Sequence, residues 1–374
     1  SVRRKNVKKK ILVLFLLSTM ILGGCSTQKI TDSSSQKEEA QEAKNQDISE
    51  ESTDGEADES QEASKDVFAM DTYMTVTAYG SHGEEAVEKA AAEIERLDGL
   101  LSTGEESSEI AQVNANGGGT LGKDASYLVE RALEFGESTD GAFDIAIYPI
   151  MAEWGFTTGD FKVPSKETLD SLLEKTKLSD VVFDKETSTV SFKTDGMAID
   201  LGGIAKGYTS TRIMDIYREC GVKSGLVNLG GNVQALGTKT DGSKWRVAIQ
   251  GVDDDDSYLG VLSISDKAVI TSGGYERYFE QDGVTYHHII DPTTGYPADS
   301  GLLSVSIVSA DGTMCDALST SLFIMGKDKA IEYWRAHSDE FDIILYDKEN
   351  KVYVSEGIAE DFTSDFDTEV VKKE

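Results

Sequence analysis

The chain is 374 residues long and carries 68 acidic side chains against 36 basic ones, which gives a formal net charge of −32 at pH 7. This balance argues against a nucleic-acid-binding protein, because such proteins neutralise phosphates with clusters of Lys and Arg. The 3 cysteines are too few for a disulfide framework, and whether Cys220 and Cys315 pair is left open.

The first 24 residues are typical of a bacterial export signal. Lys and Arg side chains between residues 3 and 10 form a basic segment, and the apolar run at 11–22 is too short to remain as a membrane-spanning helix. Leu22-Gly23-Gly24-Cys25 then resembles the lipobox at which bacterial lipoproteins are cleaved and acylated. We therefore expect Cys25 to carry lipid chains such as palmitate, on the extracytoplasmic face of the cell membrane. The alternative is an uncleaved N-terminal anchor.

Residues 25–66 are predicted to be a flexible acidic tether behind the lipidated cysteine. Ser, Glu, Gln, Asp and Ala dominate this segment, so folding could not bury enough apolar surface to offset the lost chain entropy. One acyl chain binds a membrane only marginally, so stable anchoring would need two. The folded domain is expected to span 67–360, with an acidic tail at 361–374.

The first half of the domain mixes the periodicities of helices and strands. In chain order it predicts a strand at 73–79, helices at 84–101 and 124–139, an apolar segment at 142–156, a helix opened by Pro164 and Ser165 and ending at 173, a hairpin of 181–183 with 189–192, and a helix at 204–220.

The second half is richer in strands. It predicts strands at 226–233, 245–250, 261–264, 286–290 and 302–308, then a helix at 314–325 and a hairpin at 342–354. Because helices and strands do not alternate regularly, the expected fold class is α+β rather than a doubly wound parallel sheet.

The first segment suited to phosphate chemistry is Asp200-Leu201-Gly202-Gly203-Ile204-Ala205-Lys206-Gly207. It leaves a strand and enters a helix, where glycines allow close approach of the backbone and the helix N-terminus offers free N–H groups to an anion. Lys206 adds a positive charge. The alternative is an ordinary glycine turn before a helix, since the segment is neither a Walker loop nor GxGxxG.

A second segment pairs a carboxylate with a hydroxyl. Asp316 and Thr320 are four residues apart in a predicted helix, so they share one face of it. Such hard oxygen ligands suit Mg²⁺, which keeps several waters and takes few protein groups. The alternative is an Asp N-cap beside a buried Thr.

A third segment, Tyr286 to Pro297, places two of the four histidines at a strand end before an Asp-Pro turn. His288 could there act as a general base or orient an attacking hydroxyl, although a neighbouring carboxylate or a metal-bound water could also take the proton. The alternative is a pair of packed structural histidines. A zinc site is not expected, because the chain contains no HExxH or CxxC motif.

In this order, the motifs between Phe68 and Met325 resemble those of the ApbE family of FAD:protein FMN transferases. The matching segments are Met70-Asp71-Thr72, Leu101-Ser102-Thr103, Gly141-Ala142-Phe143-Asp144, Asp200 to Gly207, Asn228-Leu229-Gly230-Gly231-Asn232, Thr271-Ser272-Gly273, His288 to Gly295 and Asp316 to Thr320. The resemblance implies two duplicated T-fold-like subdomains with the flavin between them. The residues that it places around FAD are Met70, Ala142, Phe143, Asp144, Asp200, Lys206 and Ile290. It implies Mg²⁺ held by the Gly203 carbonyl, Asp316, Thr320 and Ser319. His288 is our candidate for the catalytic base.

The same resemblance implies the reaction and its partners. FMN would pass from FAD to a Thr or Ser hydroxyl of an exported or membrane flavoprotein, such as an FMN-binding-domain lipoprotein or a subunit of a redox pump, and AMP would leave. The alternatives are a Mg²⁺-dependent FAD pyrophosphatase and a non-catalytic flavin-binding lipoprotein. Gly104 departs from the family, in which many members have an aromatic residue after Leu-Ser-Thr. We therefore expect either that Tyr73 or Phe143 stacks on the flavin instead, or that stacking on the flavin is weaker.

Overall fold

The computed structural model describes residues 59–252 and 257–374. The predicted signal segment and Cys25 lie outside the described residues, as does most of the predicted tether. Within the described part, both cysteines are free thiols, Cys315 buried and Cys220 half-buried. None of the helices described is long and apolar enough to cross a membrane.

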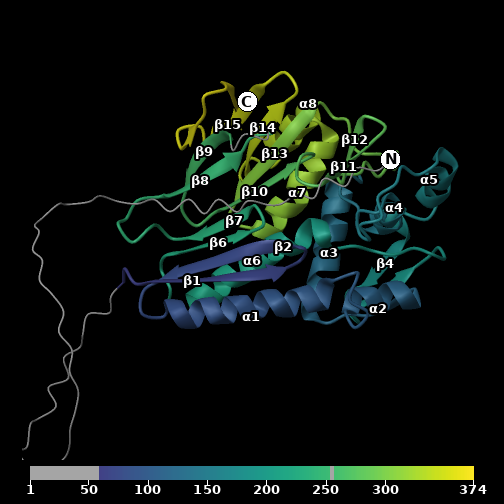
Figure 1. Ribbon diagram of the computed structural model, residues 1–374, viewed down its shortest axis with the longest axis horizontal. Coiled ribbons are helices and arrows are strands. Elements are labelled where there is room, and N and C mark those ends of the chain that lie inside the picture. The colour runs from purple at the N-terminus through teal and green to yellow at the C-terminus, as the bar shows by residue number, and fades with distance from the viewer. Residues whose placement is uncertain (1–58, 253–256) are drawn as a thin grey trace, which may run out of the picture. The chain divides into compact units, whose positions relative to one another are not determined.

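A nine-stranded sheet organises the domain (Figure 1). Its order is β1-β2-β6-β7-β10-β13-β14-β15-β17, and neighbouring strands are antiparallel except for the parallel pair β15–β17. The strands are β1 (Glu62–Ala69), β2 (Thr72–Tyr79), β6 (Gly225–Leu229), β7 (Asn232–Leu236), β10 (Ala268–Gly273), β13 (Leu302–Ser309), β14 (Asp342–Asp347), β15 (Lys351–Ser355) and β17 (Asp367–Val371).

Three smaller sheets complete the strand structure. They consist of β3 (Gly118–Thr120), β5 (Thr189–Phe192) and β4 (Val181–Asp184); of β16 (Phe362–Thr363), β9 (Tyr258–Ile264) and β8 (Trp245–Gln250); and of the pair β11 (Tyr278–Gln281) and β12 (Val284–His287). Apolar side chains of β8 and β9, such as Trp245 and Leu262, pack against those of the large sheet, such as Val308 and Ile344. The large sheet is therefore covered by strands on this face.

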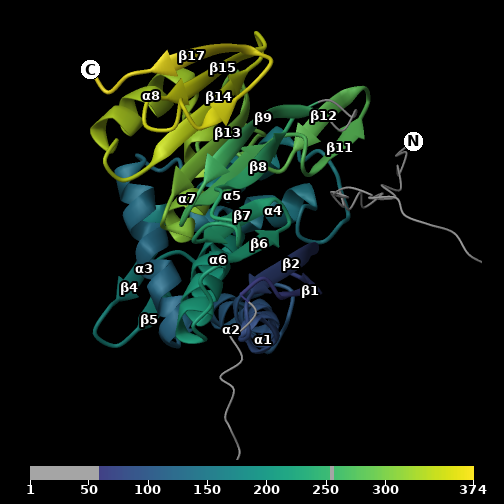
Figure 2. The same cartoon turned by 90° about the vertical axis from the view of Figure 1, so that its left-hand side faces the viewer.

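Helices cover the opposite face of the large sheet. The helices are α1 (Gly83–Leu101), α2 (Glu109–Asn116), α3 (Lys123–Ser138), α4 (Tyr148–Trp154), α5 (Lys166–Leu173), α6 (Gly202–Glu219), α7 (Gly312–Met325) and α8 (Lys327–Ala336), with 3₁₀ turns η1 (Ile145–Ile147) and η2 (Leu178–Asp180). α1 lies along β1 and β2, α6 along β6 and β7, and α7 along β10 and β13 (Figures 1 and 2). This mixture of helix and sheet confirms the predicted α+β class; the duplicated subdomains stay a prediction.

Two glycines let α6 and α7 approach each other closely. A Cβ on Gly207 would lie 2.1 Å from the Gly312 carbonyl oxygen, and a Cβ on Gly312 would lie 2.6 Å from the Gly207 carbonyl oxygen. Because both obstacles are backbone atoms, no side-chain movement could make room. The contact therefore fixes the position of α7 relative to α6.

We expect Gly207→Ala to lower the free energy of unfolding by about 3 kcal/mol, as overpacking of a rigid contact does. Urea denaturation of the variant and the parent measures the difference. Gly99→Ala is the matched control, because nothing lies within 4 Å of its added Cβ in α1. That change should stabilise the helix by about 0.5–1 kcal/mol. Equal stabilities of the two variants would contradict the proposed close contact.

Several predicted boundaries are wrong. The segment 226–233 is not one strand, because the chain turns at Gly230 and Gly231 with φ of +67° and +104° and returns as β7. Such positive φ values suit a tight hairpin, and they favour glycine at both central positions. The predicted strand 286–290 ends at His287, which leaves His288 just beyond β12.

The segment 361–374 is not a tail outside the domain. β16 pairs with β9, and β17 pairs in parallel with β15. Phe362 and Val371 are both buried. At the other end, β1 begins at Glu62, inside the segment predicted as tether. Pairing of β1 with β2, of β16 with β9 and of β17 with β15 therefore makes both segments part of the folded domain.

Candidate active site

A buried carboxylate, Asp316 of α7, lies at the contact between α6 and α7. Its side chain is 6% exposed; Oδ2 accepts a 2.8 Å bond from the Gly207 N–H, and Oδ1 accepts a 3.1 Å bond from Asn232 Nδ2. Both donors are neutral. Burial raises the pKa of Asp316, against the opposing effect of the nearby Lys206 ammonium. A carboxylate in this setting gains stability from a cation.

A chain of hydroxyls continues from Asp316 along the same helix. Ser319 Oγ donates to the Asp316 carbonyl oxygen at 2.9 Å, which uses its single proton. The 2.8 Å contact between Ser272 and Ser319 must then be donated by Ser272, and the 3.3 Å contact between Ser272 and Thr320 by Thr320. The Ser319 oxygen thus keeps one lone pair for another partner, and the Thr320 oxygen keeps both of its lone pairs.

Lys206 of α6 connects this carboxylate to the predicted base. Lys206 is half-buried; its charge opposes the rise that burial causes in the pKa of Asp316, and it helps to lower the pKa of His288. Its position follows from the glycine contact described above, which holds this part of α6 against α7. Lys206 thus lies within electrostatic range of both groups.

His288 is held in one tautomer. Its backbone N–H and its Nδ1 both bond to the Arg277 carbonyl oxygen, at 3.0 and 3.1 Å. Because a carbonyl only accepts, Nδ1 carries the proton and Nε2 carries the lone pair. Burial and the charges of Arg277 and Lys206 lower the pKa of His288 to about 3. At neutral pH it is an uncharged imidazole that can accept a proton at Nε2.

The neighbouring His287 has a different role. Its Nε2 lies 3.1 Å from the Ala298 carbonyl oxygen, so Nε2 donates, and its Nδ1 accepts from the Ile289 N–H at 3.2 Å. Both ring nitrogens are therefore used within the protein. Of the two adjacent histidines, His287 is structural and His288 has a ring nitrogen to offer.

Two further carboxyl side chains, those of Asp144 and Asp200, belong to backbone segments that are hydrogen-bonded to each other. The Asp200 N–H donates to the Ile145 carbonyl oxygen at 2.9 Å, which brings Asp200 beside the chain that carries Asp144. Burial raises the pKa of Asp144 to about 7. Burial also raises the pKa of Asp200, against the opposing charge of Arg277. Asp144 is thus a second group that could exchange a proton near neutral pH.

Phe143 is poorly placed to stack on a flavin. It is 4% exposed, it packs edge-on against Phe135, and its Cε2 would lie 3.2 Å from a Cβ on Gly203. Tyr73 is 57% exposed and forms an edge contact with Phe68, 63% exposed, at 5.0 Å between ring centroids. Of the two expected stacking residues, only Tyr73 therefore has a ring face that a ligand could reach.

The remaining predicted flavin residues occupy three separate places. Met70 lies in the β1–β2 turn with φ of +48°. The Ala142 N–H donates to the Thr139 carbonyl oxygen at 3.1 Å. Ile290 is 4% exposed and belongs to the apolar cluster around Trp154. Their contact with a flavin stays a prediction.

The comparisons with known proteins agree on one family. The ApbE family profile matches residues 70–345. An FAD:protein FMN transferase of Klebsiella pneumoniae is 35% identical over 278 residues, which cover 74% of this chain and 86% of the relative. One of Treponema pallidum is 32% identical over 320 residues, covering 80% and 88%. The chain belongs to the ApbE family.

A solved structure of the ApbE protein of Thermotoga maritima has the same fold. It is 32% identical, with a TM-score of 0.74 over 79% of this chain and 98% of that one. The α+β architecture of this ApbE member is therefore that of its family.

Three residues of this ApbE member that contact the site were not predicted as site residues. They are Arg277, whose carbonyl holds His288; Asn232, which donates to Asp316; and Ser272, which bonds Ser319. Each lies in a segment that the sequence marks as a polar turn, Asn228 to Asn232 or Thr271 to Arg277. What the sequence lacks is any sign of which helix these turns face.

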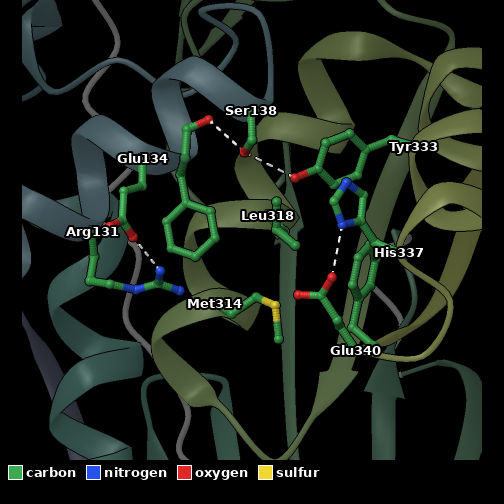
Figure 3. A pocket seen from close by; sticks show the side chains of 10 residues that line it. Arg131, Glu134, Ser138, Met314, Leu318, Tyr333, His337 and Glu340 are labelled. Atoms are coloured by element: carbon green, nitrogen blue, oxygen red, sulfur yellow. Dashed lines mark hydrogen bonds and ion pairs between the residues drawn. The ribbon is translucent and has the colours of Figure 1, made fainter.

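A separate pocket lies between α3, α7 and α8 (Figure 3). It measures about 180 Å³, which is small for a dinucleotide. Its polar side chains pair with one another, Ser138 with Tyr333 at 3.1 Å and His337 with Glu340 at 2.9 Å (Figure 3). Met314 and Leu318 of α7 line it, and none of the residues predicted for catalysis, flavin or metal does. It is therefore not the site of the ApbE reaction.

Proposed function

We propose that this chain is an FAD:protein FMN transferase that uses Mg²⁺, attaches FMN to a Thr or Ser hydroxyl of exported or membrane flavoproteins, and releases AMP. Membership of the ApbE family and the names of the relatives support the transferase activity. The observation that carries the chemistry is a neutral His288 with its lone pair on Nε2, within the field of Lys206, whose charge also acts on the buried Asp316.

The donor groups fit Mg²⁺. Asp316 and Thr320 offer hard oxygens, and the Gly207 N–H, which in a regular helix would bond only to the Gly203 carbonyl, is directed at Asp316. The Gly203 carbonyl can then contribute a further lone pair. Among the described residues, no group of three or more His, Cys, Asp or Glu side chains could hold a metal. This suits an ion that takes few protein ligands and completes its shell with phosphate and water.

We assign the metal to Asp316, Thr320, the Gly203 carbonyl and Ser319, whose oxygen keeps one lone pair. When bound there, Mg²⁺ would supply Lewis-acid stabilisation of charge on the pyrophosphate oxygens. Lys206 and the N-terminal end of α6 would add positive potential beside these metal-binding residues.

The proposed transfer is a displacement at one phosphorus. The acceptor hydroxyl gives its proton to His288 Nε2, and its oxygen bonds to the phosphorus of the FMN half of FAD. The bond between that phosphorus and the oxygen bridging to AMP breaks, and AMP leaves with the electron pair. The products are AMP and a phosphoester between FMN and the acceptor residue. FAD hydrolysis would be the same displacement with water in place of the hydroxyl.

We also propose that the chain is lipid-anchored through Cys25 on the extracytoplasmic face of the membrane. The basic and apolar segments before Leu22-Gly23-Gly24-Cys25 support this. Labelling of the expressed chain with a radioactive fatty acid, with Cys25→Ala as the control, decides whether the cysteine is acylated.

Mass spectrometry of an acceptor tests the transferase function. We expect an FMN-binding-domain protein, incubated with the chain, FAD and Mg²⁺, to gain the mass of FMN minus one water while AMP appears in equal amount. If AMP and free FMN accumulate and the acceptor mass stays constant, the chain is a pyrophosphatase. If FAD remains intact, it is a flavin-binding lipoprotein.

A further inference from the structure

An exposed pair of aromatic side chains lies at the turn end of the β1–β2 hairpin, at the edge of the nine-stranded sheet. Phe68 and Tyr73 face each other across the two strands, with 5.0 Å between ring centroids, and they are 63% and 57% exposed. The β8–β9 layer reaches this face at the other end of β2, where the Tyr79 ring lies 6.0 Å from that of Trp245. Because aromatic residues are enriched in protein interfaces, the pair has the character of a contact surface.

The face of the hairpin that carries this aromatic pair is acidic. Side chains alternate between the two faces of a strand, so Glu62 and Asp66 of β1 lie on the same face as Phe68. Asp66 accepts a 2.7 Å bond from the Thr75 hydroxyl, and Glu62 accepts one of 2.7 Å from the Tyr79 hydroxyl. Both donors are neutral, and neither carboxylate forms an ion pair in the part of the chain that the structure describes. The face therefore keeps both negative charges.

The opposite face of the hairpin packs on α1. Val67 and Met74 are buried there in the apolar cluster that β1 and β2 share with this helix. Lys65, the single basic residue in the sequences of the two strands, also lies on that side and pairs with Glu88 of α1. The two strands thus supply no positive charge to the face that carries the aromatic pair.

The aromatic pair lies at the same end of the sheet as the buried carboxylate of the candidate active site. Thr72, next to Tyr73, packs on the β6–β7 turn, where a Cβ on Gly230 would lie 2.4 Å from Thr72 Oγ1. Asn232, two residues after that glycine, donates to Asp316 at 3.1 Å. A protein bound to the aromatic pair would therefore lie beside the end of the sheet at which Asp316 is held.

We propose that Phe68 and Tyr73, with the flanking Glu62 and Asp66, form a docking surface for the acceptor protein. An apolar side chain of the acceptor packs on the two rings, and Lys or Arg side chains beside it pair with the two carboxylates. The proposal rests on the transferase function proposed above, and it adds the place and the chemistry of acceptor recognition.

The charge of the docking surface distinguishes a basic acceptor from other occupants. The acidic segment that precedes the domain carries the same sign of charge as this face, as do anionic lipid headgroups, so both are repelled. A second copy of the chain, docked symmetrically, would bring the same two carboxylates against this face. A basic surface of another protein is the occupant that complements it.

Binding of an acceptor to the full chain, without FAD and with EDTA, tests the docking surface. The probe is a fluorescently labelled FMN-binding-domain protein, and its anisotropy measures Kd. Phe68 is the residue to replace, because Tyr73 is also an expected flavin contact. We expect Phe68→Ser to raise Kd about tenfold or more, since a few aromatic contacts carry most of the energy of an interface. Asp66→Lys should also raise Kd, because repulsion of a basic acceptor replaces attraction.

The matched control is Val370→Ser, which removes an exposed apolar side chain from β17, the strand at the opposite edge of the sheet. This control should bind like the parent. The docking surface is contradicted if the parent does not bind the probe, if Phe68→Ser binds like the parent, or if Asp66→Lys binds more tightly. It is also contradicted if sedimentation shows a dimer that Phe68→Ser dissociates, because the surface would then join two copies of the chain.

The docking surface and the transferase function can fail separately. An acceptor that binds to this surface and never gains the mass of FMN supports the docking surface and contradicts the transferase function. If Phe68→Ser transfers FMN with the parent's KM for the acceptor, the transferase function stands and the docking surface is contradicted.

Discussion

Replacing Asp316 by Asn should slow FMN transfer by at least about 100-fold while leaving the fold intact. The variant keeps the shape of the side chain and an oxygen that can accept from the Gly207 N–H. It loses the negative charge, which accepts hydrogen bonds only from neutral donors and forms no ion pair within the described residues. Because a buried, unpaired carboxylate is costly, its removal should change the free energy of unfolding little, so the loss of rate reports the metal site.

The measurement is the initial rate of FMN transfer at increasing Mg²⁺, together with thermal unfolding with and without Mg²⁺. Parent protein should be stabilised by Mg²⁺, and Asp316→Asn should not. Asp311→Asn is the matched control, since it makes the same substitution at the N-cap of the same helix, where Asn caps as well as Asp. Full activity in Asp316→Asn would remove Asp316 from the metal site.

The helices that carry the site were predictable because local chemistry fixes their ends. α7 starts after Asp311, whose side chain accepts from the Met314 N–H, and stops at Gly326. α6 is followed by Gly221 with φ of +81°, a conformation that favours glycine. The structure places both helices within two residues of the predicted bounds.

The errors lie where tertiary pairing decides. Residues 226–233 have continuous strand character, and only the positive φ of Gly230 and Gly231 divides them into two strands. β17 is acidic and has four exposed residues out of five, so nothing local distinguishes it from a tail. Its place in the sheet comes from pairing with β15, which no local pattern contains.

The residues of the site also fall into those that the sequence predicts and those that only the fold brings there. Lys206, His288 and Asp316 stand in segments whose residue types already suggested phosphate, proton and metal chemistry. The neighbours that define their state come from elsewhere: Asn232 lies 84 residues before Asp316, and the Arg277 carbonyl lies 11 residues before His288. The sequence could therefore predict which groups react, but not which tautomer or charge state they hold.

The free lone pair on Nε2 of His288 is the basis of the second prediction, a large loss of rate when His288 is replaced. His288→Gln should lower kcat by about 10²–10⁴-fold, the usual worth of a general base, while FAD still binds. His337→Gln is the control, because it removes a histidine from the separate pocket. Tryptophan fluorescence on titration with FAD measures binding, and transfer of FMN at saturating FAD measures kcat. Equal losses in both variants, or no loss in His288→Gln, would contradict the role of His288.

The pH dependence of the transfer rate distinguishes His288 from Asp144, the other group that could take the proton. A base must be unprotonated, so the rate falls as pH drops below its pKa. With the pKa of His288 lowered to about 3, kcat/KM should stay level from pH 8 down to about pH 5, since kcat/KM reports the free enzyme. If Asp144 takes the proton, its pKa of about 7 makes kcat/KM fall below neutral pH.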